Sequence, residues 1–356
     1  MTLQQGLART EEASHFEPDI LFESWNKGQS YLPKDEDLRS SIISTFNLPH
    51  NDSYVYHATA SVTLLQAQQA INHGEKAGLH AWYLDSEGKP LLPPPPVDVL
   101  AYTSIFAPNT ATSKALIGFA ANAKKGSIRS KVASHLRSLR VLPQNLTIPK
   151  SRNHINPYYD FWCWSCQNLE WTGPEEGTAN IRTSHHILPI FMHHFGCVAP
   201  SYESLEVIKQ SAGKRVVLEI GSGNGYWVYM LRRMGVSVKA VDNLQSEYRT
   251  MWIGDTLVAD GEKYLRDEKG CKDAVLLLVY PIVSLDFTAK VLDAYKGDTI
   301  CVVGTQNRSG YTAFRDRTID EYMKAEKVDY EKTVQIPLPS FPGKDEALYI
   351  FERQTS

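Results

Sequence analysis

Residues 215–226 read Arg-Val-Val-Leu-Glu-Ile-Gly-Ser-Gly-Asn-Gly-Tyr, and residues 238–242 read Val-Lys-Ala-Val-Asp. The run from Val216 to Ile220 is short, apolar and rich in β-branched residues, which is typical of a parallel strand buried on both faces. The glycines that follow allow a tight turn and let a ligand approach the backbone. A helix from about Tyr226 would point its N-terminal amides at that ligand. The stretch therefore predicts a site for a nucleoside-containing molecule.

The glycine spacing narrows the choice of ligand. A dinucleotide site would read G-x-G-x-x-G, but Tyr226 stands where the third of those glycines would be. The glycines run G-x-G-x-G behind Glu219 instead. This pattern resembles motif I of the class I S-adenosylmethionine (SAM) methyltransferases. Asp242, at the end of the next expected strand, can accept two hydrogen bonds from a ribose diol.

The rest of the chain continues the resemblance. Further strands are expected at 237–242, 256–260, 273–280 and 298–304, and a final pair at 333–337 and 347–353. That pair resembles the antiparallel hairpin that distinguishes methyltransferase sheets from nicotinamide-binding sheets. The fold class expected is α/β, a Rossmann-like seven-stranded methyltransferase sheet whose last strand is antiparallel, with a mainly helical N-terminal lid or substrate region. The domains expected are 1–150, a mostly helical accessory region; 151–200, an aromatic-rich lid or linker; and 201–356, the SAM-binding domain.

The resemblance implies roles for individual residues around SAM. Glu219 would lie near the methionine ammonium, Asp242 would take the ribose hydroxyls, and Asp260 would accept from the adenine amine. Trp252 would stack on adenine or, equally well, be a core aromatic residue. The full set expected to hold the cofactor is Glu219, Gly221, Ser222, Gly223, Asn224, Gly225, Tyr226, Asp242, Asn243, Leu244, Trp252, Asp260, Gly261 and Tyr280.

Composition limits the classes of protein that fit. The formal net charge of −3 does not suggest a polyanion-binding protein. No stretch approaches the roughly 20 apolar residues of a membrane span. The N-terminus, Met1 to Ile20, has no apolar signal core, and five cysteines fit a reducing compartment better than a disulfide framework. We expect a cytoplasmic monomer or homodimer whose partner is a small-molecule acceptor; a membrane is not expected and nucleic acid is disfavoured.

A basic stretch leaves three alternatives open. Residues 124–140 hold six basic residues and no acid, with an apolar face at helical spacing over 127–140. The stretch fits a solvated amphipathic helix, a basic rim that attracts anionic substrates, or a nucleic-acid surface. The net negative charge of the chain and the lack of interleaved aromatic residues count against a nucleic-acid surface.

The aromatic stretch 156–171 contains three of the chain's seven tryptophans. In small-molecule methyltransferases the segment before the core commonly folds over the SAM sulfonium as a lid, and aromatic walls suit a cationic methyl group. Trp162 and Trp164 are therefore candidates to contact the substrate. A packing joint between the two halves of the chain is the competing interpretation.

Histidines and cysteines cluster between 163 and 197. Cys163 and Cys166 form a C-x-x-C pair, but zinc sites usually show a second pair at defined spacing, so no metal is expected. A helix is expected over 184–195, interrupted at Pro189, with some of its histidines partly facing the substrate. One of them could be a general base, or all could be core or surface residues. The catalytic candidates are His193, His194, Tyr158 and Tyr159.

The acceptor is the least determined feature. Methyltransferases that act on nitrogen in planar groups often carry Asn/Asp-Pro-Pro-Tyr after the fourth strand, whereas 279–282 here read Val-Tyr-Pro-Ile. A carboxylate is already an anion at pH 7 and needs only orientation, while an alcohol needs a base. The stretches His193–Leu205 and Gly221–Arg233 resemble fungal small-molecule O-methyltransferases of secondary metabolism, at least one of which esterifies small dicarboxylic acids. The orienting candidates are Arg152, Arg182, Gln306 and Asn307, with Tyr158 and Tyr159.

That resemblance, together with the lack of an evident His–Asp pair to act as a base, favours carboxyl O-methylation of small mono- or dicarboxylic acids. The alternatives are methylation of a hydroxyl or amine with a histidine base, a SAM-binding module that does not methylate, and a methyltransferase of RNA or protein. An aromatic lid would favour an enclosed site for a small molecule.

Overall fold

The computed structural model of the protein describes residues 16–58, 60–74, 76–77, 79–283 and 286–354. Residues 1–15 of the predicted accessory region lie outside this range. None of the helices in the described part is long and apolar enough to cross a membrane.

A seven-stranded sheet forms the C-terminal half of the chain, with strand order β5-β4-β3-β6-β7-β9-β8. The strands are β3 (Val217–Ile220), β4 (Val238–Asp242), β5 (Leu257–Val258), β6 (Val275–Val279), β7 (Thr299–Thr305), β8 (Tyr330–Pro337) and β9 (Glu346–Arg353). The pairs from β5 to β7 are parallel, and β9 pairs antiparallel with both β7 and β8. This arrangement confirms the predicted Rossmann-like sheet with an antiparallel last strand.

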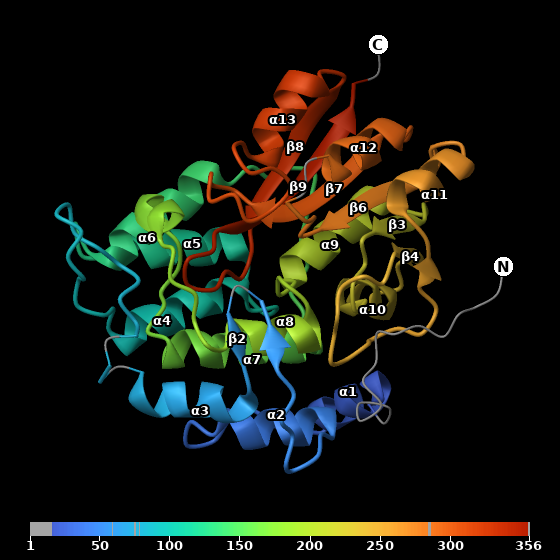
Figure 1. Cartoon of the computed structure of the whole chain (residues 1–356). Helices are drawn as coiled ribbons and strands as arrows, with labels where there is room; N and C mark the ends of the chain where they lie inside the picture. Colours follow the sequence, from blue (N-terminus) through green and yellow to red (C-terminus); the bar gives the residue numbers. More distant parts are fainter. Residues whose placement is uncertain (1–15, 59, 75, 78, 284–285, 355–356) are drawn as a thin grey trace.

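Helices cover both faces of this sheet. Figure 1 shows α11 (Gly261–Asp267), α12 (Phe287–Ala294) and α13 (Ile319–Glu326) on one side, and α9 (Tyr202–Ala212) and α10 (Tyr226–Arg233) on the other. Side chains alternate along the strands, as the two-residue period of a strand requires. Leu277 and Val303 point into the core on the α10 side, whereas Leu276 and Val302 point into the core beneath α11 to α13.

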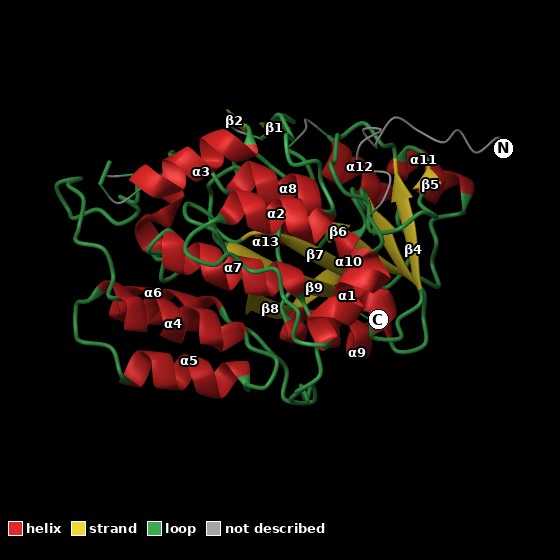
Figure 2. Cartoon of the chain, turned by 90° about the horizontal axis from the view of Figure 1, so that it is seen from below, coloured by secondary structure: helices red, strands yellow, loops and turns green. Residues whose placement is uncertain are grey.

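The described residues between 16 and 200 are mainly helical and pack on the α10 side of the sheet (Figures 1 and 2). Their elements are α1 (Pro18–Asn26), α2 (Leu38–Phe46), β1 (Tyr56–His57), β2 (Ser61–Val62), α3 (Leu64–His73), α4 (Pro96–Thr103), η2 (Ser104–Phe106), α5 (Thr112–Ala121), α6 (Ile128–Leu139), α7 (Pro157–Asn168), η3 (Glu176–Asn180) and α8 (Leu188–Phe195). One hydrophobic core joins these helices to the sheet: it includes Phe22 of α1, Phe161 of α7 and Ile350 of β9.

Two helix boundaries differ from those expected. The helical spacing of Leu64, Ala67 and Ile71 predicts a helix over 61–72, but the helix begins at Leu64. Thr63 and Gln66 form a capping box there, and residues 61–62 pair with β1. The helix expected over 184–195 begins at Leu188, with Pro189 in its first turn rather than as an interruption. The His185 side chain accepts a hydrogen bond from the Leu188 amide, which satisfies one of the free amides at the helix start.

Candidate functional site

A pocket of about 530 Å³ lies at the carboxyl ends of β3, β4 and β6. Open α/β sheets commonly bind ligands at this edge. Three segments supply most of its walls: the glycine turn after β3, the loop after β4, and the segment after β6. The α8–α9 connection and His57 of β1 complete the wall from the N-terminal half. A volume of this size is typical of small-molecule sites.

The glycine turn needs glycine for two separate reasons. Gly221, Gly223 and Gly225 have φ of +75°, +55° and +80°, a backbone region that other residues rarely adopt. A Cβ on Gly223 would lie 2.6 Å from the Tyr248 hydroxyl, and one on Gly225 would lie 2.4 Å from Cγ1 of Ile253. The loop after β4 thus packs directly on the turn.

Buried polar atoms without a partner line the glycine turn. Among the described residues, Oε2 of Glu219, Oγ of Ser222 and Nδ2 of Asn224 have no hydrogen-bond partner. All three side chains belong to the pocket wall. Burial, together with the negative charge of Asp242, raises the pKa of Glu219 well above its usual value. An ammonium group in the pocket would supply Glu219 with the missing partner and charge.

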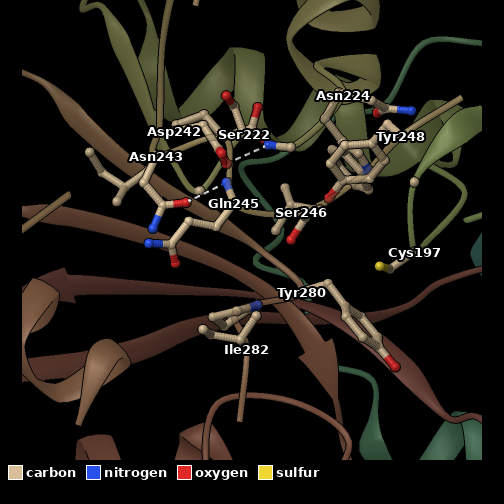
Figure 3. A pocket seen from close by; sticks show the side chains of 18 of the residues that line it. Cys197, Ser222, Asn224, Asp242, Asn243, Gln245, Ser246, Tyr248, Tyr280 and Ile282 are labelled. Carbon is tan, nitrogen blue, oxygen red and sulfur yellow. Dashed lines mark hydrogen bonds between the residues drawn. The ribbon is translucent and has the colours of Figure 1, made fainter. Parts of the chain in front are cut away.

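Asp242 ends β4 and holds the turn in place. One carboxylate oxygen accepts from the Gly223 amide at 2.8 Å and the other from the Leu244 amide at 2.6 Å. Each oxygen keeps a lone pair for a further donor, such as a ribose hydroxyl. Figure 3 shows Asp242 and Asn243 on one side of the pocket and Tyr280 on the other.

Four of the residues predicted to hold the cofactor do not line the pocket: Gly225, Leu244, Trp252 and Asp260. The Trp252 indole is buried, donates to the His194 carbonyl at 2.6 Å and stacks on Phe195. Asp260 is exposed and caps α11, because its side chain accepts from the Lys263 amide. The other ten predicted cofactor residues do line the pocket.

Gly261 is one of these ten residues, and it also lies where α11 packs on β3. A Cβ there would lie 2.3 Å from Cγ2 of Ile220, so glycine lets α11 approach β3 closely.

His193 is the one predicted catalytic residue that reaches the pocket wall. Its Nδ1 lies 3.0 Å from the Tyr54 hydroxyl, and its Nε2 lies 2.8 Å from the carbonyl and 3.1 Å from the amide nitrogen of His57. Burial lowers its pKa, so the ring is neutral near pH 7. Both ring nitrogens thus form hydrogen bonds, with Tyr54 and with His57 of β1, and these bonds hold the β1 segment against α8.

His194 lies in the core, away from the pocket. Its ring contacts the Thr250 hydroxyl at 2.7 Å and the Tyr56 hydroxyl at 3.0 Å, and it stacks on Phe46. Burial lowers its pKa well below the usual value. Its surroundings are those of a neutral packing residue.

The tyrosines predicted as catalytic also point elsewhere. The Tyr158 hydroxyl donates to the Gly196 carbonyl at 2.8 Å, and the Tyr159 hydroxyl donates to the Thr103 carbonyl at 3.0 Å. Neither side chain lines the pocket. Both tie α7 to its neighbouring segments.

Helix α7 packs inside the protein rather than along the pocket. Trp162 is fully buried and donates to the Ser340 carbonyl, and Trp164 packs against the same core. No residue of α7 is among those lining the pocket. Cys163 and Cys166 of this helix are free thiols. Across the described residues, no group of three or more His, Cys, Asp or Glu side chains is placed to hold a metal ion.

The predicted orienting residues lie apart from the pocket as well. Arg152 and Arg182 are exposed. Gln306 donates to Asp345 at 2.7 Å, and Asn307 donates to the other oxygen of that carboxylate at 3.5 Å. These two amides serve a buried network at the end of β7.

The basic stretch 124–140 is partly neutralised. Arg129 is buried and pairs with Asp98 at 2.9 Å. Arg140 makes a bidentate pair with Glu203 of α9. Only the remaining lysines and Arg137 face solvent, which weakens the interpretation as a nucleic-acid surface.

Several lining residues were not predicted from the sequence. They are His57, Met192, Phe195, Gly196, Cys197, Ile220, Trp227, Val241, Gln245, Ser246, Glu247, Tyr248, Ala259, Val279, Pro281, Ile282, Val283, Phe287 and Tyr311. Seven of them lie in the loops after β4 and β6, at the strand ends where ligands bind, so for these residues the position relative to the strands was a usable signal. Tyr280 was predicted for the cofactor. It has a φ of +52°, which is rare for a tyrosine and common at functional sites.

Comparisons with known proteins give only distant likenesses. No protein-family model matches the chain, and no curated protein sequence matches it. Among solved structures, the chain is similar to the Burkholderia thailandensis 1,6-didemethyltoxoflavin N1-methyltransferase, which was solved with 1,6-didemethyltoxoflavin and S-adenosylhomocysteine (SAH). The sequence identity is 12% and the TM-score is 0.31, and the match covers 42% of this chain and 76% of that one. It is also similar to the magnesium protoporphyrin IX methyltransferase of Synechocystis, solved with SAM, at 13% identity and TM-score 0.30 over 42% and 74%. A third is a possible RNA methyltransferase of Pyrococcus horikoshii, at 13% identity and TM-score 0.28 over 43% and 83%. Likenesses this weak carry no functional conclusion, so function is inferred from the chain's own residues.

Proposed function

We propose that this protein is a SAM-dependent methyltransferase that acts on an oxygen of a small molecule, with a carboxylic acid as the favoured acceptor. When bound, SAM supplies a methyl group on a sulfonium; transfer forms a C–O bond, breaks the S–CH₃ bond and leaves SAH. The cytoplasmic location and the monomeric or dimeric state are predictions that rest on the sequence.

One observation carries the cofactor assignment. The glycine turn presents a buried carboxyl, a hydroxyl and an amide, each with an atom that lacks a partner among the described residues, beside Asp242 at the next strand end. Glu219 would hold the ammonium of a bound amino acid moiety, and Asp242 would accept from a ribose. This set of donors and acceptors fits SAM, and the motif that provides it resembles that of SAM enzymes.

The surroundings of the pocket favour an acceptor that needs no base. A hydroxyl acceptor would need a group to take its proton, but both nitrogens of His193 are already in hydrogen bonds. A carboxylate, with a pKa near 4, is ionised at pH 7 and needs only to be oriented. This consideration favours ester formation over methylation of an alcohol or an amine.

Calorimetric titration of the full chain with SAH tests the cofactor assignment. We expect binding in the micromolar range, weakened by about 100-fold in Asp242→Ala, because charged hydrogen bonds to the ribose and to the turn are both lost. Asp267→Ala removes an exposed acid of α11 and should leave SAH affinity unchanged. Equal SAH affinity in Asp242→Ala and the native protein would contradict the proposal.

The acceptor class is tested with SAM carrying a radiolabelled methyl group and a panel of aromatic and aliphatic acids, alcohols and amines. We expect a labelled product that mild alkali hydrolyses, as it does methyl esters. Labelled products that are all stable to alkali would show ether or amine formation instead. SAH binding without label transfer to any compound would favour a SAM-binding module that does not methylate, and transfer only to RNA or protein would favour a macromolecular substrate.

A further inference from the structure

A partly buried lysine contacts two residues of the pocket wall. Nζ of Lys344, in the loop between β8 and β9, donates a hydrogen bond to the Tyr280 hydroxyl. The same nitrogen lies 3.7 Å from the centre of the Tyr311 ring and 5.2 Å from that of Tyr280. Both tyrosines line the pocket, as does Cys197 beside them. In Figure 3, Tyr280 and Cys197 lie on the side of the pocket away from Asp242.

This ammonium has unused hydrogen-bonding capacity. A lysine has three N–H donors, and the hydrogen bond to Tyr280 uses one of them. No carboxylate of the described residues lies within ion-pair distance of Lys344. The acidic group with the largest effect on the Lys344 pKa is Glu346, the first residue of β9. Its two carboxyl oxygens are buried and have no hydrogen-bond partner among the described residues. The two tyrosine rings stabilise a cation without neutralising it.

The electrostatics of the site favour an incoming anion. Burial lowers the pKa of Lys344, and the acidic groups of Glu346 and Cys197 oppose this effect. Burial raises the pKa of Glu346 to about 7, so below neutral pH this carboxyl is mostly protonated and competes little for the ammonium. Burial also raises the pKa of the Cys197 thiol to about 12, which leaves that thiol uncharged. A ligand carboxylate would be the strongest available partner for the ammonium.

Tyr280 is held in an unfavourable backbone conformation at this point. Its φ of +52°, immediately before Pro281, lies in the left-handed region that residues other than glycine rarely adopt. The amide of Tyr280 is fixed to the Val303 carbonyl of β7. This conformation directs the residue into the pocket wall, where its hydroxyl meets Lys344.

We propose that Lys344, together with the Tyr280 hydroxyl, binds the carboxylate of the acceptor, with the rings of Tyr280 and Tyr311 against its apolar part. The inference rests on the proposed function, for which it names the residue that selects acids. An acid would be held by its negative charge, and its neutral methyl ester would lose that attraction. The lysine therefore favours binding of the acid and release of the ester.

The test uses the full chain saturated with SAH and two probes, benzoate and succinate, titrated by calorimetry. At least one should bind, and its uncharged amide, benzamide or succinamide, should bind at least about 10-fold more weakly. Lys344→Met should weaken that carboxylate by about 10- to 100-fold while SAH affinity stays unchanged, which also shows that the variant is folded. Tyr280→Phe, which removes only a hydroxyl, should give a smaller loss. Lys324→Met, an exposed lysine of α13, should have no effect.

Three results would overturn the inference while leaving the cofactor assignment intact: neither carboxylate binds the SAH complex, acid and amide bind equally, or Lys344→Met binds the acid as the native protein does. Tighter binding of benzylamine than of benzoate would likewise overturn it, in favour of a cationic acceptor. Failure of the native protein to bind SAH is a different outcome, since it contradicts the proposed function itself.

Discussion

Glu346 should make the folding stability of this protein fall as the pH rises toward neutrality. Its side chain is buried, and neither carboxyl oxygen has a hydrogen-bond partner among the described residues. Burial raises its pKa from 4.5 to about 7; the positive charge of Lys344 opposes the rise and Asp345 adds to it. The folded protein thus keeps a proton that the unfolded chain releases. The contribution of Glu346 to stability is greatest below pH 4.5, falls between there and about pH 7, and is level above.

The magnitude follows from the two pKa values of Glu346. Each pH unit between 4.5 and about 7 is worth about 1.4 kcal/mol, so ionisation of this carboxyl destabilises the folded state by about 3 kcal/mol at pH 8. Glu346→Gln keeps the shape and removes the ionisation. We therefore expect the variant to match the native protein at pH 4.5 to 5 and to exceed it by up to about 3 kcal/mol at pH 8.

Urea unfolding of both proteins at half-unit steps from pH 5 to pH 8 measures this difference. Glu352→Gln, which changes an exposed glutamate of the same strand, is the matched control and should run parallel to the native protein. If the free energies of unfolding of Glu346→Gln and the native protein differ by the same amount at every pH, the buried carboxyl does not titrate as the structure implies. The reasoning about the charge around Lys344 would then be wrong as well.

Three further predictions concern how the N-terminal half is attached. Burial lowers the pKa of His135, but its 2.7 Å contact with the buried Asp345 outweighs burial, so the pKa is raised. The stabilisation from this contact is complete below pH 6.5 and is lost as the pH rises through the raised pKa. In urea unfolding, His135→Gln should therefore lower the free energy of unfolding more at pH 6 than at pH 9. Arg249→Met should cost about 3–5 kcal/mol in the same assay, because it leaves the charge of Asp52 buried, and adding Asp52→Asn should recover part of that loss. A fragment of residues 201–356 should bind an apolar dye and lack a cooperative unfolding transition, because one face of its sheet would lose its cover.

The sheet could be predicted because its signal is local. Central strands buried on both faces are short apolar runs, and β3 and β6 fell within one or two residues of the expected limits. The edge strand β5 shrank from five expected residues to two, since an edge strand has one neighbour and less to bury. The short β1–β2 pair was not predicted, because two-residue strands leave no pattern in a sequence.

The glycine turn could also be predicted, but the direction of single side chains could not. Asp242 and the turn are close in sequence, so their contact follows from the strand–turn–helix geometry. Trp252 follows the same strand, yet its indole lies in a core that includes Phe16 and Phe22 of the N-terminal half. Nothing near Trp252 in the sequence reveals that packing.

Lys344 was missed for the same physical reason. It is 64 residues from Tyr280, and the two meet only because β6 and the β8–β9 loop end at the same edge of the sheet. A lone lysine in a loop with Pro342 and Gly343 is otherwise ordinary. The candidates chosen instead, Arg152 and Arg182, were near the expected lid in sequence, but the helix of that lid packs inside the protein.

The site and the stability of this protein depend on the same contacts. One wall of the pocket comes from β1 and the α8–α9 connection, and the other from the sheet, while a single core joins the two halves behind both walls. Because protein interiors are close-packed and transmit strain, a change in that core shifts one wall against the other. His193 illustrates the link: it lines the pocket, and its ring also fixes β1 to α8. Substitutions at such positions alter binding through geometry, so SAH affinity and unfolding free energy must be measured together before any of these residues is assigned a chemical role.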